Sequence, residues 1–126
     1  MFQSLEVFQL SHKMAVHAGR RQAVISQNVA NADTPEYVAR DLPKFSDVVE
    51  PNASDMQRAT RAAHLHGVVN GRDAPILEDT SHASINGNTV SIEKEMLRAV
   101  ETKRQHDRAL AIYKSAMTVL QKTLQK

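Results

Sequence analysis

Cysteine and tryptophan are both absent from this 126-residue chain, and its only aromatic residues are three Phe and two Tyr. Without cysteine the chain can form no disulfide, no thiolate metal site and no cysteine nucleophile, although this does not identify a compartment. Aromatic side chains contribute much of the apolar area of a close-packed core. We therefore expect one domain with a thin core.

A strong charge of either sign is also lacking, since 16 Lys and Arg oppose 14 Asp and Glu, for a net charge of +2. The cations are scattered and no aromatic residues alternate with them, so nucleic acid is not an expected partner. The first residues, MFQSLEVFQLSHKM, lack the charged and apolar regions of a cleavable signal peptide, and no run approaches membrane-spanning length. If the chain leaves the cytoplasm, we expect another export route.

Catalytic signatures such as G-x-S-x-G, the P-loop and H-E-x-x-H do not occur in the sequence. Acidic residues alternate with cations on helical stretches such as EKEMLR, as solvated pairs do. His64 and His66 would share one side of a strand with His82 nearby, but a metal site needs a rigid frame and supporting hydrogen bonds, which this segment does not promise. We expect no enzyme, no cofactor and no metal; a small His-ligated metalloprotein is a weaker alternative.

Two helical segments dominate what is present. From about Gln3 to Ala30 there is no Pro and one Gly, and apolar residues recur with a helical period. The second helix is expected to begin after Ser91, a good N-cap, with Glu93 and Glu95 near the positive end of the dipole. Spacings of three and four give it a heptad seam that polar Lys103 and His106 interrupt. The seam comprises Met96, Ala99, Lys103, His106, Leu110, Tyr113, Met117, Leu120 and Leu124.

We predict a mainly α fold in which the two terminal helices, roughly 40 and 50 Å long, pack as an antiparallel, coiled-coil-like hairpin. The start of each helix should face the end of the other. The predicted helix–helix interface comprises Val7, Leu10, Met14, Ile25, Val29, Met96, Leu110, Tyr113, Met117, Leu120 and Leu124. Each helix also carries a second apolar strip, which indicates a second packing partner. These strips are Leu5, Val16, Ala23 and Ala30, and Ile112, Ala116 and Val119.

The middle of the chain contains three of the four prolines and three of the four glycines. Asn70-Gly71 and Asn86-Gly87 are good turn sequences, LHGVVN and APIL resemble short strands, and a short helix would fit residues 54–65. We expect a loop-rich, partly extended and partly ordered middle with one hairpin. The predicted division is 1–35 for the first helix and its turn, 36–88 for the middle, and 89–126 for the second helix.

The stretch QNVANADTPEYVARDL, residues 27–42, ends the first helix abruptly. Asn28 and Asn31 are poor helix-interior residues, Asp33 can accept backbone N–H groups, and Pro35 forces Thr34 out of the helical region. Taken alone, this is a helix stop followed by a turn.

The same stretch resembles the motif ANxxANxxTPGY of bacterial flagellar axial proteins, whose terminal helices pair into a tube-forming domain. NADTPEYVARDL followed by Phe45, together with NGNTVSIEKEM at residues 86–96, is similar to proximal-rod basal-body proteins of the FlgB type. Glu36 stands where the family usually has Gly, so we expect a type I turn with Pro35 at its second position. Thr102 and His106 occupy places that the family often gives to Asn and Tyr. The resemblance implies an assembly motif of Asn28, Ala30, Asn31, Asp33, Thr34, Pro35 and Tyr37.

The resemblance implies a structural subunit that assembles helically into the hollow drive shaft between the rotor ring with its export gate and the distal rod. Implied partners are copies of the chain, other rod proteins, the rod-to-ring adaptor, the membrane-supramembrane ring and the type III export gate. The implied location is the periplasmic rod, reached without a cleavable signal. Apolar strips on more than one side of both helices agree with this. The alternative is a soluble helical-hairpin adaptor that binds a partner through its heptad seam.

Overall fold

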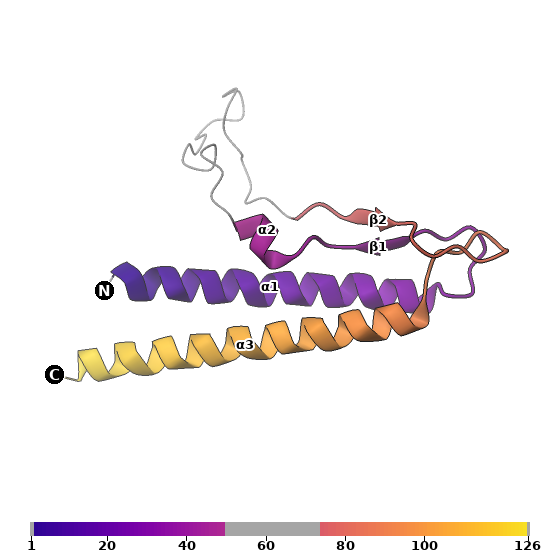
Figure 1. The fold of residues 1–126 in the computed structure, drawn as a ribbon. Helices are drawn as coiled ribbons and strands as arrows, with labels where there is room; N and C mark the ends of the chain where they lie inside the picture. The colour runs from indigo at the N-terminus through magenta and orange to yellow at the C-terminus, as the bar shows by residue number, and fades with distance from the viewer. Residues whose placement is uncertain (1, 50–73, 126) are drawn as a thin grey trace, which may run out of the picture.

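The computed structural model describes residues 2–49 and 74–125. Along the chain it forms helix α1 (Phe2–Ala30), strand β1 (Ala39–Asp41), helix α2 (Phe45–Val49), strand β2 (Leu77–Asp79) and helix α3 (Ile92–Leu124). In Figure 1, α1 and α3 run side by side in opposite directions, with both chain termini at one end, and the strands lie along the other side of α1. The predicted mainly α fold with two long helices in contact is confirmed.

Helix α3 begins where the sequence predicts. Ser91 has extended backbone angles, φ −107° and ψ 114°, and its hydroxyl accepts a long hydrogen bond from Lys94 N at 3.5 Å. Glu95 N donates to Ser91 O at 2.9 Å, which is the first bond of the helix. The N-cap of α3 is therefore confirmed.

The turn after α1 differs from the prediction. Tyr37 N donates to Thr34 O at 3.3 Å, and between them Glu36 has a φ of 59°. A positive φ at the third position makes this a type II turn, so the expected type I turn is wrong. The reason is tertiary: Glu36 N donates to Asn86 O at 3.1 Å, and this bond holds Glu36 in a conformation that costs a non-glycine residue about 1–2 kcal/mol.

The two strands pair antiparallel, with Ala39 opposite Asp79 and Asp41 opposite Leu77. We call residues 33–44 and 74–90, which include both strands, the arm. The predicted Asn86-Gly87 turn is confirmed, since Gly87 has a φ of 79° and its N–H donates to Ser84 O at 3.0 Å. Helix α2 was not predicted. The other predictions for the middle, namely LHGVVN, the Asn70-Gly71 turn and the 54–65 helix, lie outside the described residues.

The contact between α1 and α3 uses small and polar side chains. Along α3 the buried residues recur every seven positions, as in a coiled coil: Glu95, Thr102, Ala109 and Ala116. Along α1, Ser11, Ala18 and Ile25 are buried with the same spacing. The α3 stripe lies one residue before the predicted seam, whose members Met96 and Leu124 are 65% and 79% exposed. Small residues bring the helices close together and leave the large apolar ones outside.

A second small core lies between α1 and the arm. It consists of Val24, Leu42 and Ala74, with Val48 of α2 packed against it. Among the described residues, no helix is both long enough and apolar enough to cross a membrane.

Candidate assembly site at the arm end of the helices

The side chain of Asn28 ties the last turn of α1 to strand β1. Its Nδ2 donates to Arg40 O at 2.6 Å, and its Oδ1 accepts from Arg40 N at 3.1 Å. The hydroxyl of Tyr37 donates to the same Oδ1 at 3.3 Å. Asn28 is completely buried, so its amide replaces the backbone partner that Arg40 would have in a wider sheet.

Asn88, which lies between β2 and α3 in the sequence, forms hydrogen bonds at the C-terminal end of α1. Its Nδ2 lies 2.9 Å from Asn31 O, 2.9 Å from Ala32 O and 2.7 Å from Thr34 O. Its Oδ1 accepts from Val90 N at 2.8 Å. An amide has two N–H donors, so these carbonyls share them. The orphan carbonyls at the end of a helix need such partners, and here one buried side chain supplies them.

Thr89 continues the connection beside Asn88. Its hydroxyl oxygen accepts from Ala39 N at 2.7 Å, and its own N–H donates to Tyr37 O at 3.0 Å. The two stretches that carry the resemblance, NADTPEY and NGNTV, therefore lie against each other although 48 residues lie between them in the sequence. The sequence pointed to both stretches but did not assign a role to Asn88 or Thr89.

The predicted assembly motif divides into two groups. Asn28 and Tyr37 point into the polar junction, by which we mean the place where α1, the arm and α3 meet. Ala30, Asp33, Thr34 and Pro35 are exposed. Asn31 is half-buried; its Nδ2 donates to Gln27 O at 2.8 Å and its Oδ1 accepts from the Thr34 hydroxyl at 3.2 Å. The inward group builds the turn and the outward group forms its surface.

A network of charged side chains joins the arm to both long helices. Arg21 of α1 donates to both carboxylate oxygens of Asp41, at 2.9 and 3.0 Å. Arg98 of α3 lies 3.3 Å from the same carboxylate and also donates to Asp79 and, at 2.7 Å, to Glu95. The network therefore links α1, β1, β2 and α3. Pairs with this bidentate, largely buried geometry hold their partners more firmly than surface pairs do.

Asp79 is the centre of the network on the β2 side. Lys94 Nζ donates to it at 2.6 Å, and the backbone N–H of Ser81 donates to Oδ1 at 3.0 Å. Burial raises the pKa of Asp79, but the hydrogen bonds from Lys94, Ser81 and Arg98 outweigh burial and hold this pKa well below its usual range. Burial lowers the pKa of Arg98, but the carboxylates of Asp79, Asp41 and Glu95 together outweigh burial, so the pKa of Arg98 is raised.

The imidazole of His17 connects α1 to the arm and to α3. Its Nε2 lies 2.9 Å from Pro43 O and its Nδ1 lies 3.1 Å from Gln105 Nε2. Since a carbonyl only accepts and an amide nitrogen only donates, the ring is neutral with its proton on Nε2. Burial lowers the pKa of His17, although the Pro43 bond opposes this. The ring also packs against Phe45, with centroids 5.5 Å apart.

The sequence did not predict this polar junction. Arg21, Asp41 and Asp79 come from different elements, and charge spacing along one helix cannot reveal such pairs. The sequence also does not predict a buried carboxylate on α3. It places Glu95 near the positive end of the helix dipole, whereas in the structure this residue is only 1% exposed. The available signal was that Asn88 and Thr89 stand in NGNTV, one of the two stretches that carry the family resemblance.

The predicted helix–helix interface is only partly buried in the single chain. Ile25 is buried, Met14 and Leu120 are half-buried, and Tyr113 meets Phe8 edge to face with centroids 4.6 Å apart. The exposed members are Val7, Leu10, Val29, Met96, Leu110, Tyr113, Met117 and Leu124. His82 is exposed, His64 and His66 lie outside the described residues, and no group of three metal-ligating side chains occurs within residues 2–49 and 74–125.

Comparison with known proteins shows which family this chain resembles. Residues 17–37, which contain His17, Arg21 and Asn28, match the model of the family described as "Flagella basal body rod protein". The flagellar basal body rod protein FlgB of Agrobacterium fabrum is 28% identical over 129 residues, covering 98% of this chain and 96% of that protein. FlgB of Yersinia ruckeri is 31% identical over 116 residues, covering 81% of this chain and 84% of that protein. The chain belongs to the FlgB family of flagellar basal body rod proteins.

FlgB of Escherichia coli K12 shows a similar relationship, at 29% identity over 115 residues that cover 81% of this chain and 83% of that protein. Membership of the FlgB family makes the chain a structural subunit of the basal body rod and not an enzyme. It also decides against the helical-hairpin adaptor.

Proposed function

We propose that this FlgB-family subunit assembles helically, with copies of itself and with other rod proteins, into the proximal part of the rod. In this role it forms part of a hollow drive shaft that links the rotor ring and export gate to the distal rod and transmits torque. On the rotor side its immediate partners are the rod-to-ring adaptor and the membrane-supramembrane ring. On the distal side its partner is the next rod protein. The type III export gate delivers it, and a chain without cysteine suits passage into an oxidising space.

One observation carries the proposal of helical assembly: the helix ends farthest from the arm expose large apolar side chains on both helices. On α1 these are Leu5, Val7, Leu10 and Val16, and on α3 they are Leu110, Ile112, Tyr113, Met117, Val119 and Leu124. A soluble monomer seldom exposes so many neighbouring apolar residues, so we assign them to contacts with adjacent subunits. Leu110, Tyr113, Met117 and Leu124 of this surface are also members of the predicted seam.

In this proposal the three predicted segments have separate roles. Residues 1–35 and 89–126 form the core that packs in the rod, and residues 36–88 contribute the arm that fixes the outline of the subunit. The outward group of the assembly motif, Asp33, Thr34 and Pro35, contacts neighbours, while Asn28 and Tyr37 shape the turn that presents them.

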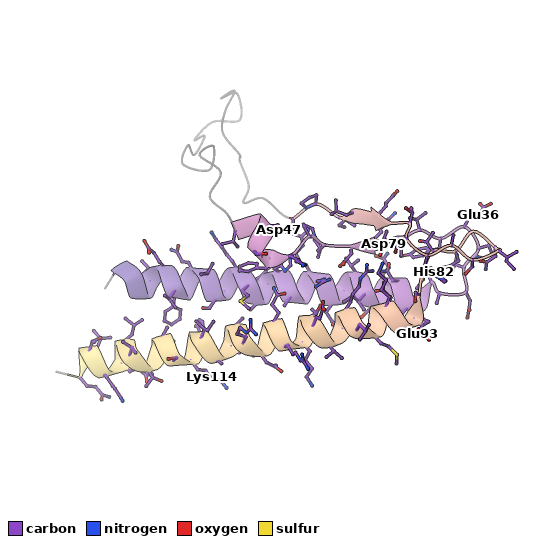
Figure 2. All side chains as sticks on the ribbon, viewed as in Figure 1. Glu36, Asp47, Asp79, His82, Glu93 and Lys114 are labelled. Atoms are coloured by element: carbon purple, nitrogen blue, oxygen red, sulfur yellow. The ribbon has the colours of Figure 1, made fainter. Side chains whose placement is uncertain are left out.

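Deletion and complementation test the proposal. A motile bacterium that lacks this chain should form no rod beyond the ring, and the intact chain should restore swimming. Val119 is exposed in the single chain and is expected to be covered by a neighbouring subunit in the rod. Val119→Asp should block rod formation, because a carboxylate would replace this apolar contact. Lys114→Gln is the matched control, because Lys114 lies on the same helix and points away from α1 (Figure 2). Normal rods and swimming in the deletion strain would refute the proposed function.

A further inference from the structure

The turn at the tip of the arm presents an isoleucine completely to solvent. Ile85 has a relative exposure of 109%, the highest among the exposed large hydrophobic residues that the structure describes. The turn itself is well held: Ser84 N donates to Asn88 O at 2.8 Å, Gly87 N to Ser84 O at 3.0 Å, and Asn88 N to Asn86 Oδ1 at 3.1 Å. A side chain on such a preformed turn can enter a partner at a small cost in conformational entropy.

The position of this turn keeps Ile85 away from α1 and α3 of its own chain. Glu36 N donates to Asn86 O at 3.1 Å, and the Cα and Cγ atoms of Glu36 lie 3.4 Å from where a side chain at Gly87 would begin. Figure 2 shows Glu36 at the far tip of the arm, beyond the ends of both long helices. The chain therefore cannot cover Ile85 with its own helices.

A groove of matching character lies between α1 and α3. Its volume is about 530 Å³, and it is lined by Ala18, Gly19, Gln22, Ala99, Val100, Thr102, Lys103 and His106. Gly19 faces open space, since a Cβ built there would meet nothing within 4 Å.

We propose that Ile85 of one subunit inserts into the α1–α3 groove of the next copy of the chain. The proposal rests on the proposed function, because it names one of the contacts that helical assembly requires. Charge favours this occupant, since the acidic Glu36 stands beside Ile85 and the cationic Lys103 lines the groove. A projecting side chain and a groove on different parts of one molecule make a heterologous contact, which can repeat without closing and so generates a helical row.

Crosslinking in assembled basal bodies tests the contact directly, because the natural chain has no cysteine. The double variant Ile85→Cys/Val100→Cys should give dimers and longer ladders when basal bodies are oxidised, and no product within one chain. The matched control is Ile76→Cys/Val100→Cys, since Ile76 is also an exposed apolar residue of the arm. It should give at least about tenfold less product. Equal yields from the two pairs, or no ladder from the first, would overturn the contact.

Substitutions test the contribution of the contact to assembly. Ile85→Asp removes the apolar side chain, and Gly19→Leu fills the groove while raising helix propensity, so neither should weaken the fold. Each should lower the affinity between copies about 10- to 100-fold, as expected when one buried aliphatic side chain is lost, and swimming should fall with it. Ile85→Val and Ile76→Asp should leave the affinity between copies and swimming nearly unchanged.

The outcomes separate this inference from the proposed function. If Ile85→Asp and Gly19→Leu both form normal rods while deletion of the chain abolishes them, the rod function stands and the contact between Ile85 and the groove is wrong. If deletion itself leaves rods intact, the proposed function fails first. Circular dichroism of each purified variant should show unchanged helix content, which ties any loss of assembly to the contact.

Discussion

The two ends of the helical hairpin are held by different interactions. At the arm end, residues 17–42 pack with residues 77–105 through buried amides and ion pairs whose partners all belong to the same chain. At the open end, residues 5–16 and 108–124 expose apolar side chains. Hydrogen bonds need partners at fixed distances, whereas apolar contacts are not directional. The buried amides and ion pairs of the arm end are therefore formed within one subunit, whereas the open end is suited to cover by a neighbour.

Hydrogen exchange on the isolated chain should show the largest contrast between these ends. Backbone amides of residues 5–16 and 108–124 should exchange at least about 100-fold faster than those of residues 20–30 and 92–104, because local opening there exposes little additional apolar surface. In assembled rods this contrast should disappear. Equal, strong protection of both ends in a verified monomer would contradict the comparison and would remove the main support for helical assembly.

Replacing Asn88 should cause the largest loss of stability among single substitutions at the arm end. Asn88→Ala leaves the carbonyl of Ala32 and the N–H of Val90 without the partner that Asn88 supplies. It also removes a second donor from the carbonyls of Asn31 and Thr34, which still accept from Thr34 N and Tyr37 N. Each unsatisfied buried group costs about 1–3 kcal/mol, and partial access of water reduces the sum, so we expect a loss of about 2–4 kcal/mol in urea unfolding.

Asn31→Ala is the matched control for this experiment. The hydrogen bonds of the Asn31 side chain, to Gln27 O and from the Thr34 hydroxyl, are exposed to solvent, so water can replace them. Its loss should stay below about 0.5 kcal/mol. A similar loss from both variants would mean that the junction is solvated and that the arm end is no firmer than the open end.

Acid should weaken the arm end before the open end. The pKa of Asp79 is lower in the folded chain than in the unfolded chain, where it lies near 3.9. The unfolded state therefore binds the proton more readily, and the stability that Asp79 contributes is present above about pH 4 and lost as the pH falls below it. Unfolding midpoints measured from pH 6 to pH 2 should show this loss, and Asp79→Asn should flatten the curve below pH 4.

His17 should add an earlier and smaller step of the same sign. Because burial lowers the pKa of His17 in the folded chain, its contribution is present above about pH 6.5, the value for an unfolded chain, and declines as the pH falls through that value. His17→Gln, whose amide can still donate to Pro43 O, should remove this step. A decline that persists in His17→Gln would assign the step to a group elsewhere in the chain.

The sequence predicted those features that depend on neighbouring residues. The period of apolar residues placed both helices, Ser91 placed the start of α3, and Asn86-Gly87 placed a turn, because each signal acts within a few residues of its cause. The predicted seam lies one residue after the observed buried stripe of α3, because the prediction assigned the large apolar side chains to the helix–helix contact. The structure instead buries Ala109, Ala116 and the paired Glu95 between the helices.

The polar junction could not have been predicted in the same way. Asn28, Asn88 and Asp79 gain their roles only when the chain brings α1, the arm and α3 together, and no spacing along one element encodes that meeting. The conformation of Glu36 follows from the same cause. Local preference favours a type I turn, but the bond from its N–H to Asn86 imposes a positive φ.

That imposed conformation allows a final, small test of how firmly the arm end is held. Glu36→Gly should relieve the strain of a φ of 59°, while the greater freedom of Gly in the unfolded chain offsets part of the gain. The expected result is a stabilisation of about 0.5–1 kcal/mol in urea unfolding, and Glu36→Ala, which keeps a Cβ, should show almost none. Equal effects of the two substitutions would indicate that the turn relaxes to a negative φ in solution. The tip of the arm would then resemble the open end, with its final shape set by a neighbouring subunit.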